Sequence, residues 1–257
     1  MTVTDTQLLA WVQQYLWPFL RIGGLLMIAP VLGARTVAPR IRIALAALLT
    51  LMVAPLLPPA EPLAMFTAAW WVCLTQQLLI GLCMGFVLQL AFEALLLGGE
   101  LIAYSMGLSF AQLADPLRGA STPVVGQFLT IWATLLFLSL DGHLGLIELL
   151  FKSFQTLPVS GPGLGTVELE RLLRYSGSLF AGGLSLALPV VIALLVVNLA
   201  MGVIGRAAPT LNLFAVGFPV TLTAGLLLLR ASLPSLGESF ERLLAQALEL
   251  VSVLIGA

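Results

Sequence analysis

Residues 98–116 read Gly98-Gly-Glu-Leu-Ile-Ala-Tyr-Ser-Met-Gly-Leu-Ser-Phe-Ala-Gln-Leu-Ala-Asp-Pro116, and they lie between apolar runs long enough to cross a bilayer. The stretch combines glycines and serines with a carboxylate at Glu100, and residues 118–123 after it are typical of a loop. Irregular backbone at membrane depth is tolerated only where protein covers it or where it lines a water-filled path. This segment therefore predicts a conduit or a gate, and not a simple membrane anchor.

The composition defines the class of protein. Of the 257 residues, 60% are hydrophobic and 9% are charged, whereas soluble domains average roughly 25% charged residues. The mean hydropathy is +1.09. These values predict an integral membrane protein. The net charge of −1 and the scattered basic residues give no sign of a nucleic-acid partner, and no polar linker divides the chain into two soluble domains.

Six hydrophobic regions are long enough to be considered as membrane spans, by the criterion of about 20 apolar residues each. They cover residues 8–32, 41–57, 65–97, 124–140, 178–204 and 214–229. If all six crossed the membrane, five basic residues would lie on each side, so the positive-inside rule does not support six plain crossings. Either the third region makes two passes, or some regions do not span.

A last helix is predicted over about Pro234–Ile255, and its pattern differs from that of the six regions. Its apolar positions recur every three or four residues, as in an amphipathic helix. We expect one face to be buried, formed by Leu236, Phe240, Leu243, Leu244, Ala247, Val251 and Leu254. The opposite face carries Glu238, Glu241, Arg242, Gln246 and Glu249.

Three charged residues lie inside apolar runs. Glu93 and Glu100 are seven residues apart, so two helical turns place them on one face. Carboxylates in such positions line an ion or protein path, or they pair with an arginine of a neighbouring chain or lie at the interface. Arg21 either pairs with a carboxylate or extends to the membrane interface.

Glycine spacing and sulfur-containing residues point to dense helix packing near a gate. Gly81-Leu-Cys-Met-Gly85 has the small-xxx-small pattern that lets two helices approach closely. Tyr104, Met106 and Phe110 cluster beside the glycine-rich segment, and flexible methionine suits a constriction that seals and reopens. Ordinary helix packing explains the same cluster equally well.

Enzyme chemistry is poorly supported by the sequence. The single histidine, His143, excludes a multi-histidine metal site. The sequence contains no HExxH motif, no P-loop and no dinucleotide fingerprint. Cys73 and Cys83 are ten residues apart in one apolar run, which predicts two small buried side chains. We therefore expect a protein that is not an enzyme and that needs no metal and no cofactor.

Several blocks of sequence, in order along the chain, resemble the FliR/SctT family. The blocks are Arg21-Ile-Gly-Gly, Pro30-Val-Leu-Gly33, Val37-Ala-Pro-Arg-Ile-Arg42, Gly98-Gly99-Glu100, Met106-Gly-Leu-Ser-Phe110, Asp115-Pro116, Asp141-Gly-His143, Ser153-Phe154 with Pro158, and Asn198…Gly202…Arg206-Ala-Ala-Pro209-Thr-Leu-Asn212-Leu-Phe214…Gly217-Phe-Pro219. Each block alone is modest, but the ordered set from about Arg21 to Leu229 is specific. Ser105 departs from the family pattern, which usually has a glutamine before the Met-Gly pair.

The resemblance implies a subunit of the type III secretion export gate. It implies an all-α membrane protein made of helical hairpins, with residues 1–177 similar to FliP and residues 178–257 similar to FliQ, in one export-gate domain. Such subunits join FliP-like and FliQ-like subunits in a right-handed spiral cone, raised from the membrane plane toward the periplasm. FlhB-like and FlhA-like proteins are the further partners, and energy comes through partners from the proton gradient.

The resemblance also implies a gating loop, or plug, over about Met106–Pro123, which includes Gly107 and places Met106, Phe110 and Gln112 near the pore axis. Unfolded flagellar proteins would pass through this pore at the flagellar basal body in the bacterial inner membrane. Two alternatives stay open. One is the export gate of a virulence injectisome, and the other is a self-contained secondary transporter that uses Glu93 and Glu100 as proton or ion sites.

Overall fold

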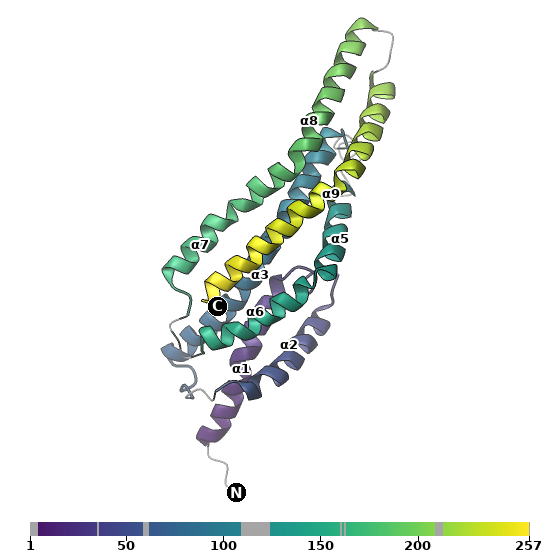
Figure 1. Cartoon of the computed structure of the whole chain (residues 1–257). Helices are drawn as coiled ribbons and strands as arrows, with labels where there is room; N and C mark the ends of the chain where they lie inside the picture. Colours follow the sequence, from purple (N-terminus) through teal and green to yellow (C-terminus); the bar gives the residue numbers. More distant parts are fainter. Residues whose placement is uncertain are drawn as a thin grey trace. The chain divides into compact units, whose positions relative to one another are not determined.

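The computed structural model describes residues 5–34, 36–58, 62–108, 124–159, 161, 163–208 and 213–256, and every regular element in these ranges is a helix. This confirms the predicted all-α class. The elements are α1 (Asp5–Ile28), α2 (Pro39–Val53), the short 3₁₀ helix η1 (Ala54–Leu56), α3 (Ala68–Ser105), α5 (Val124–Ser139), α6 (Gly142–Thr156), α7 (Thr166–Ser176), α8 (Ser178–Ala207) and α9 (Leu213–Ile255) (Figure 1).

Helix α3 is longer than the sequence pattern suggested. The third hydrophobic region was expected to end at Leu97, but the helix continues through Gly98 and Gly99 to Ser105. Glycine inside a helix costs roughly 0.5–1 kcal/mol relative to alanine. Close contacts with two other helices, described below, offset this cost, so the glycines are part of the helix and do not form a loop.

Helix α9 joins two segments that the sequence suggested were separate. The sixth region and the last amphipathic helix form one helix of 43 residues, with Pro219 and Pro234 inside it. Proline removes one main-chain hydrogen bond of a helix. Leu229 and Leu236 lie two turns apart on either side of Pro234 and are both buried, so one packed face continues past the proline.

The predicted amphipathic pattern of the last helix is confirmed. Six of its seven expected apolar positions are buried, and the seventh, Leu243, is half-buried. All five expected polar positions, from Glu238 to Glu249, are exposed. Periodicity therefore identified the packed face of this helix correctly, even though it placed the start of the helix too late.

The described residues contain four helical stretches that are long and apolar enough to cross a membrane, or five if α5 and α6 form one broken span. The four are Pro39–Leu56, Ala68–Ser105, Thr166–Ala207 and Val216–Ile255. Helix α1, which corresponds to the first predicted region, is not among them, and it carries Gln13, Gln14 and Arg21. The count agrees with the distribution of basic residues, which did not support six plain crossings.

The chain forms two compact units. The first comprises Met1–Leu90, Leu138–Ser176 and Ala245–Ala257, and the second comprises Ala91–Phe137 and Gly177–Leu244. In the second unit, the ring of Phe92 contacts Phe137 and Phe240 edge-on, with centroid distances of 5.6 and 5.2 Å. Aromatic pairs favour this geometry. The division into a FliP-like and a FliQ-like part stays a prediction.

Candidate functional site

Helix α3 ends in a motif that stops the helix sharply. The Gly107 N–H donates to the Tyr104 carbonyl at 3.0 Å, and the Leu108 N–H donates to the Ala103 carbonyl at 3.1 Å. These are the two hydrogen bonds of a Schellman motif. In this motif the first residue after the helix cap takes the left-handed conformation. Gly107 has φ +81° and can take this conformation because it has no Cβ.

The end of α3 is held by two further helices of the second unit. The Met106 side chain is 0% exposed, and a Cβ built on Gly225 of α9 would lie 2.5 Å from its Cγ atom. From α8, the Asn198 side-chain amide donates to the Ser105 carbonyl at 3.1 Å. This hydrogen bond satisfies a carbonyl that has no partner within its own helix. The point where the chain leaves α3 is therefore fixed by α8 and α9.

The two glycines of the quoted segment contact two different helices. A Cβ on Gly98 would lie 3.1 Å from the Gly183 carbonyl oxygen of α8, and a Cβ on Gly99 would lie 2.8 Å from the Gly126 Cα of α5. A Cβ on Gly99 would force main-chain atoms of α5 to shift, and a Cβ on Gly98 would make a contact with α8 that is tighter than usual. The first part of the glycine-rich segment is thus covered by protein.

The predicted gate residues are placed only in part. Met106 is buried inside the second unit, and Gly107 forms the helix end, whereas Phe110 and Gln112 lie outside the described residues. The position of the described pair relative to a pore axis stays a prediction.

The two carboxylates of α3, Glu93 and Glu100, are half-buried. The Cγ atom of Glu100 lies 3.6 Å from the position of a Cβ on Gly126, so this side chain runs beside α5. Glu93 and Glu100 lie on one helix and in one unit. That they line a path for ions or proteins stays a prediction.

The guanidinium of Arg21 is the centre of a polar cluster in the first unit, and its side chain is 0% exposed. Its Nε atom donates to the Gln77 side-chain oxygen at 2.8 Å. One terminal nitrogen donates to the main-chain carbonyl and the hydroxyl of Ser153, at 2.6 and 3.2 Å. The other terminal nitrogen donates to the Leu157 carbonyl at 2.7 Å. The guanidinium also lies over the Phe154 ring, 4.4 Å from its centroid.

This cluster ties three helices together through one charge. The carbonyls of Ser153 and Leu157 belong to the C-terminal end of α6, where the helix dipole favours a cation. The Ser153 carbonyl also accepts the Leu157 N–H at 3.0 Å. Arg21 of α1 supplies that cation and also binds Gln77 of α3.

The sequence left carboxylate pairing and extension to the interface open for Arg21, whereas the structure shows a fully buried side chain whose acceptors are neutral oxygen atoms. Sequence reasoning missed Gln77 and Ser153 as partners. Gln77 was a polar side chain within an apolar run, and Ser153 was quoted only as part of the block Ser153-Phe154.

Helices α1 and α3 pack closely at three glycines. A Cβ on Gly81 would overlap the Arg21 carbonyl oxygen, and a Cβ on Gly85 would lie 2.9 Å from the Leu25 carbonyl oxygen. From the α1 side, a Cβ on Gly24 would lie 2.8 Å from the Leu78 carbonyl oxygen. Both glycines of the small-xxx-small pattern thus lie at a helix–helix contact, and this contact positions Arg21.

Metal binding finds no support in the described ranges. Within them, no group of three or more His, Cys, Asp or Glu side chains gathers in a way that could hold a metal ion. The two features that the geometry singles out are therefore a fixed helix end in the second unit and a buried arginine cluster in the first.

Comparison with known proteins identifies a family that spans nearly the whole chain. Residues 12–247 match bacterial export proteins, family 1. The flagellar biosynthetic protein FliR of Pectobacterium carotovorum subsp. carotovorum is 43% identical over 252 residues, which cover 98% of this chain and 96% of the relative. The protein of the same name from Escherichia coli (strain K12) is 40% identical over 256 residues, with coverages of 99% and 97%. The Bacillus subtilis (strain 168) protein is 29% identical over 218 residues, covering 84% of each chain.

The matched range, residues 12–247, contains every helix from α2 to α8, and the helices of this chain are apolar enough for a membrane protein. The chain is an all-α membrane protein that belongs to the bacterial export proteins, family 1.

Proposed function

We propose that this chain is a non-enzymatic subunit of the flagellar protein export gate in the bacterial inner membrane, at the flagellar basal body. The observation that carries the proposal is the similarity, at 40–43% identity over almost the whole chain, to two proteins named flagellar biosynthetic protein FliR. In this proposal the chain forms part of a pore, raised toward the periplasm and closed at rest, through which unfolded flagellar proteins leave the cytoplasm.

The exposed apolar surface of the chain supports a multi-subunit assembly. In an apolar stretch of 18 residues within the span that contains α8, 17% of the residues are buried within the chain. In the corresponding stretch of α3, 67% are buried. Large exposed side chains occur all along α8 and include Phe180, Leu184, Ile192, Leu195, Leu199 and Val203. An apolar surface of this extent needs lipid or protein to cover it. We propose that FliP-like and FliQ-like subunits cover part of it and that FlhB-like and FlhA-like proteins complete the gate.

We further propose that the plug of the pore begins at Gly107. The Schellman motif ends α3 at this residue, and Met106 and Asn198 hold the helix end against α9 and α8. A plug that must open and close needs a fixed point of attachment, and this helix end is suited to that task. Met106 is then the buried anchor of the plug.

A short deletion tests the plug. Removing residues 109–111 leaves the helix end at Met106–Gly107 intact, so we expect the gate complex to assemble. We also expect liposomes that contain this complex to leak ions faster than liposomes with the wild-type complex. The measurement is ion flux through reconstituted complexes. Removal of residues 160–162, an equally long deletion between α6 and α7, is the control and should leave the flux unchanged. If the 109–111 complex is as ion-tight as wild type, the plug assignment is wrong, although the subunit assignment stands.

Purification distinguishes a gate subunit from a self-contained secondary transporter. A tagged copy extracted in mild detergent should bring down other membrane proteins in a large complex, because in this proposal FliP-like and FliQ-like subunits cover part of the apolar surface of α8. A transporter should instead purify alone or as a small symmetric oligomer. Mass spectrometry of the eluate identifies the partners. Recovery of the chain alone, still folded and monodisperse, would overturn the proposed function itself.

A further inference from the structure

One face of helix α8 is buried in the second unit, and the opposite face is exposed. The buried residues are Gly182, Gly183, Leu186, Ala187, Val190 and Leu194. The exposed residues of the same stretch include Ala181, Leu184, Ser185, Leu188, Pro189 and Ile192. No residue from 175 to 205 is charged, so the exposed face is apolar along most of the helix. A surface of this kind needs lipid or protein to cover it.

A proline on the exposed face leaves a main-chain oxygen without its helical donor. Pro189 lies inside α8, and proline has no N–H to donate to the carbonyl four residues earlier. That carbonyl belongs to Ser185, whose own hydroxyl donates to the Gly182 carbonyl at 2.9 Å. Ser185 and Pro189 lie about one helical turn apart, and both are exposed. The exposed face of α8 therefore contains a hydrogen-bond acceptor among apolar side chains.

This acceptor distinguishes between lipid and protein as the covering of the face. It lies within Thr166–Ala207, a stretch that is long and apolar enough to cross a membrane. Acyl chains have no donor, and proline is tolerated in membrane helices where a neighbouring helix satisfies the freed carbonyl. Helices α9 and α3 contact α8 at Gly182 and Gly183, on its other face. A helix of another subunit can supply the donor that these two helices do not.

Small side chains on the same face permit a close approach of such a helix. Ala181 and Ser185 are four residues apart, which is the small-xxx-small spacing. Both are exposed, and Leu184 and Leu188 beside them are exposed too. The same spacing at Gly81–Gly85 lies at the contact of α1 and α3, so this chain already uses the pattern to pack two helices.

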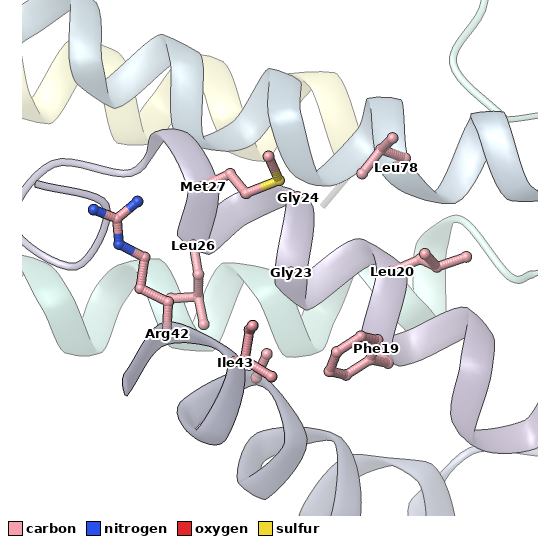
Figure 2. Close-up of a pocket in the computed structure, with 10 residues that line it drawn as sticks. Phe19, Leu20, Gly23, Gly24, Leu26, Met27, Arg42, Ile43 and Leu78 are labelled. Atoms are coloured by element: carbon pink, nitrogen blue, oxygen red, sulfur yellow. The ribbon is translucent and has the colours of Figure 1, made fainter. Parts of the chain in front are cut away.

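A second apolar surface, in the first unit, does not distinguish between lipid and protein. A groove of about 200 Å³ between α1 and α2 is lined by apolar residues that include Phe19, Met27 and Ile43 (Figure 2). Arg42, the one charged residue of this lining, donates to the Ala34 carbonyl. The lining of the groove suits an acyl chain and an apolar side chain equally, so it does not identify an occupant.

We propose that the exposed face of α8 around Ala181, Ser185 and Pro189 binds an apolar helix of a neighbouring subunit, and that a side chain of this helix donates to the Ser185 carbonyl. Hydrogen bonds between membrane helices are formed by Ser, Thr, Asn, Gln and His side chains. One of these residues is therefore expected in the partner helix opposite Ser185. The proposal rests on the proposed function, because it requires other subunits, but it concerns one surface of α8.

Photocrosslinking in the complete complex tests this interface. A benzophenone residue replaces Leu184, membranes are irradiated, and the complex is purified. We expect a covalent product with a second protein, attached at an apolar helix that carries a Ser, Thr, Asn, Gln or His within one turn. Ala181→Leu places a larger side chain in the path of that helix and should reduce the yield severalfold. Ala44→Leu makes the same change at an exposed position of α2 and should leave the yield unchanged.

Adducts with lipid alone, a crosslink within this chain, or an undiminished yield in Ala181→Leu would overturn the proposal. So would a crosslinked helix that has no donor near the attachment site. If Ala181→Leu does not assemble, the product formed without that substitution decides. A complex that assembles but labels only lipid from position 184 refutes this interface and leaves the proposed function standing, whereas a chain that purifies without partners refutes the function itself.

Discussion

Replacing Arg21 by methionine should lower the free energy of unfolding by several kcal/mol, because the guanidinium donates four hydrogen bonds and hydrogen bonds to charged groups contribute about 1.5–3 kcal/mol each. Methionine fills much of the same space but donates no hydrogen bond. The Leu157 carbonyl and the Gln77 side-chain oxygen would lose their bonds to the guanidinium, and the Ser153 carbonyl would keep only its bond from the Leu157 N–H. Denaturant titration of the detergent-solubilised protein measures the loss, and its steady-state level in membranes should fall with it.

Two other variants show whether the effect comes from the fork-shaped guanidinium. Arg21→Lys keeps the charge but has a single ammonium, which cannot match the separated acceptors, so an intermediate loss is expected. Arg174→Ala removes an arginine whose side chain is 79% exposed and paired with Glu170 on its own helix, and it should leave the unfolding midpoint unchanged. An Arg21→Met protein as stable as wild type would contradict a structural role for the cluster.

Replacing Gly81 by alanine should destabilise the protein by about 3 kcal/mol, at the upper end of what overpacking usually costs. The new methyl group would overlap the Arg21 carbonyl oxygen and lie 2.9 Å from the Leu25 nitrogen. These are main-chain atoms of α1, which no side-chain rotation can move. Helices α1 and α3 would have to separate, and the hydrogen bond between Arg21 and Gln77 would lengthen. The same denaturant titration measures this loss.

Gly23→Ala is the matched control for this substitution. It makes the same chemical change on the partner helix, but nothing lies within 4 Å of the new methyl group. Because alanine is the better helix former, we expect no loss, or a gain of up to about 1 kcal/mol. Equal unfolding midpoints for Gly81→Ala and Gly23→Ala would show that α1 and α3 do not approach as closely as described.

Composition and periodicity were sufficient to predict the properties that depend on a single segment of the sequence. The excess of apolar residues predicted a membrane protein, and the three- and four-residue spacing identified the buried face from Leu236 to Leu254. The Gly81–Gly85 spacing predicted a close helix contact. Each of these follows from the chemistry of residues that are neighbours along one helix, so the local pattern carries the information.

The local sequence pattern did not predict that α3 and α9 are continuous helices. Gly98, Gly99 and Pro234 are residues that usually interrupt helices, and the sequence suggested breaks near them. Contacts with other helices decide the matter: Gly183 and Gly126 pack against the two glycines, and the buried face of α9 continues past Pro234. The energy that keeps these helices intact comes from partners elsewhere in the chain.

The sequence likewise did not identify the hydrogen-bond acceptors of Arg21. Its acceptors lie 56, 132 and 136 residues away along the chain. A buried arginine needs oxygen atoms around it, but carboxylates, amides and main-chain carbonyls can all supply them, and the sequence does not distinguish among these. Which helix end approaches α1 depends on the path of the whole chain, and only the three-dimensional packing of α1, α3 and α6 assigns the charge to the end of α6.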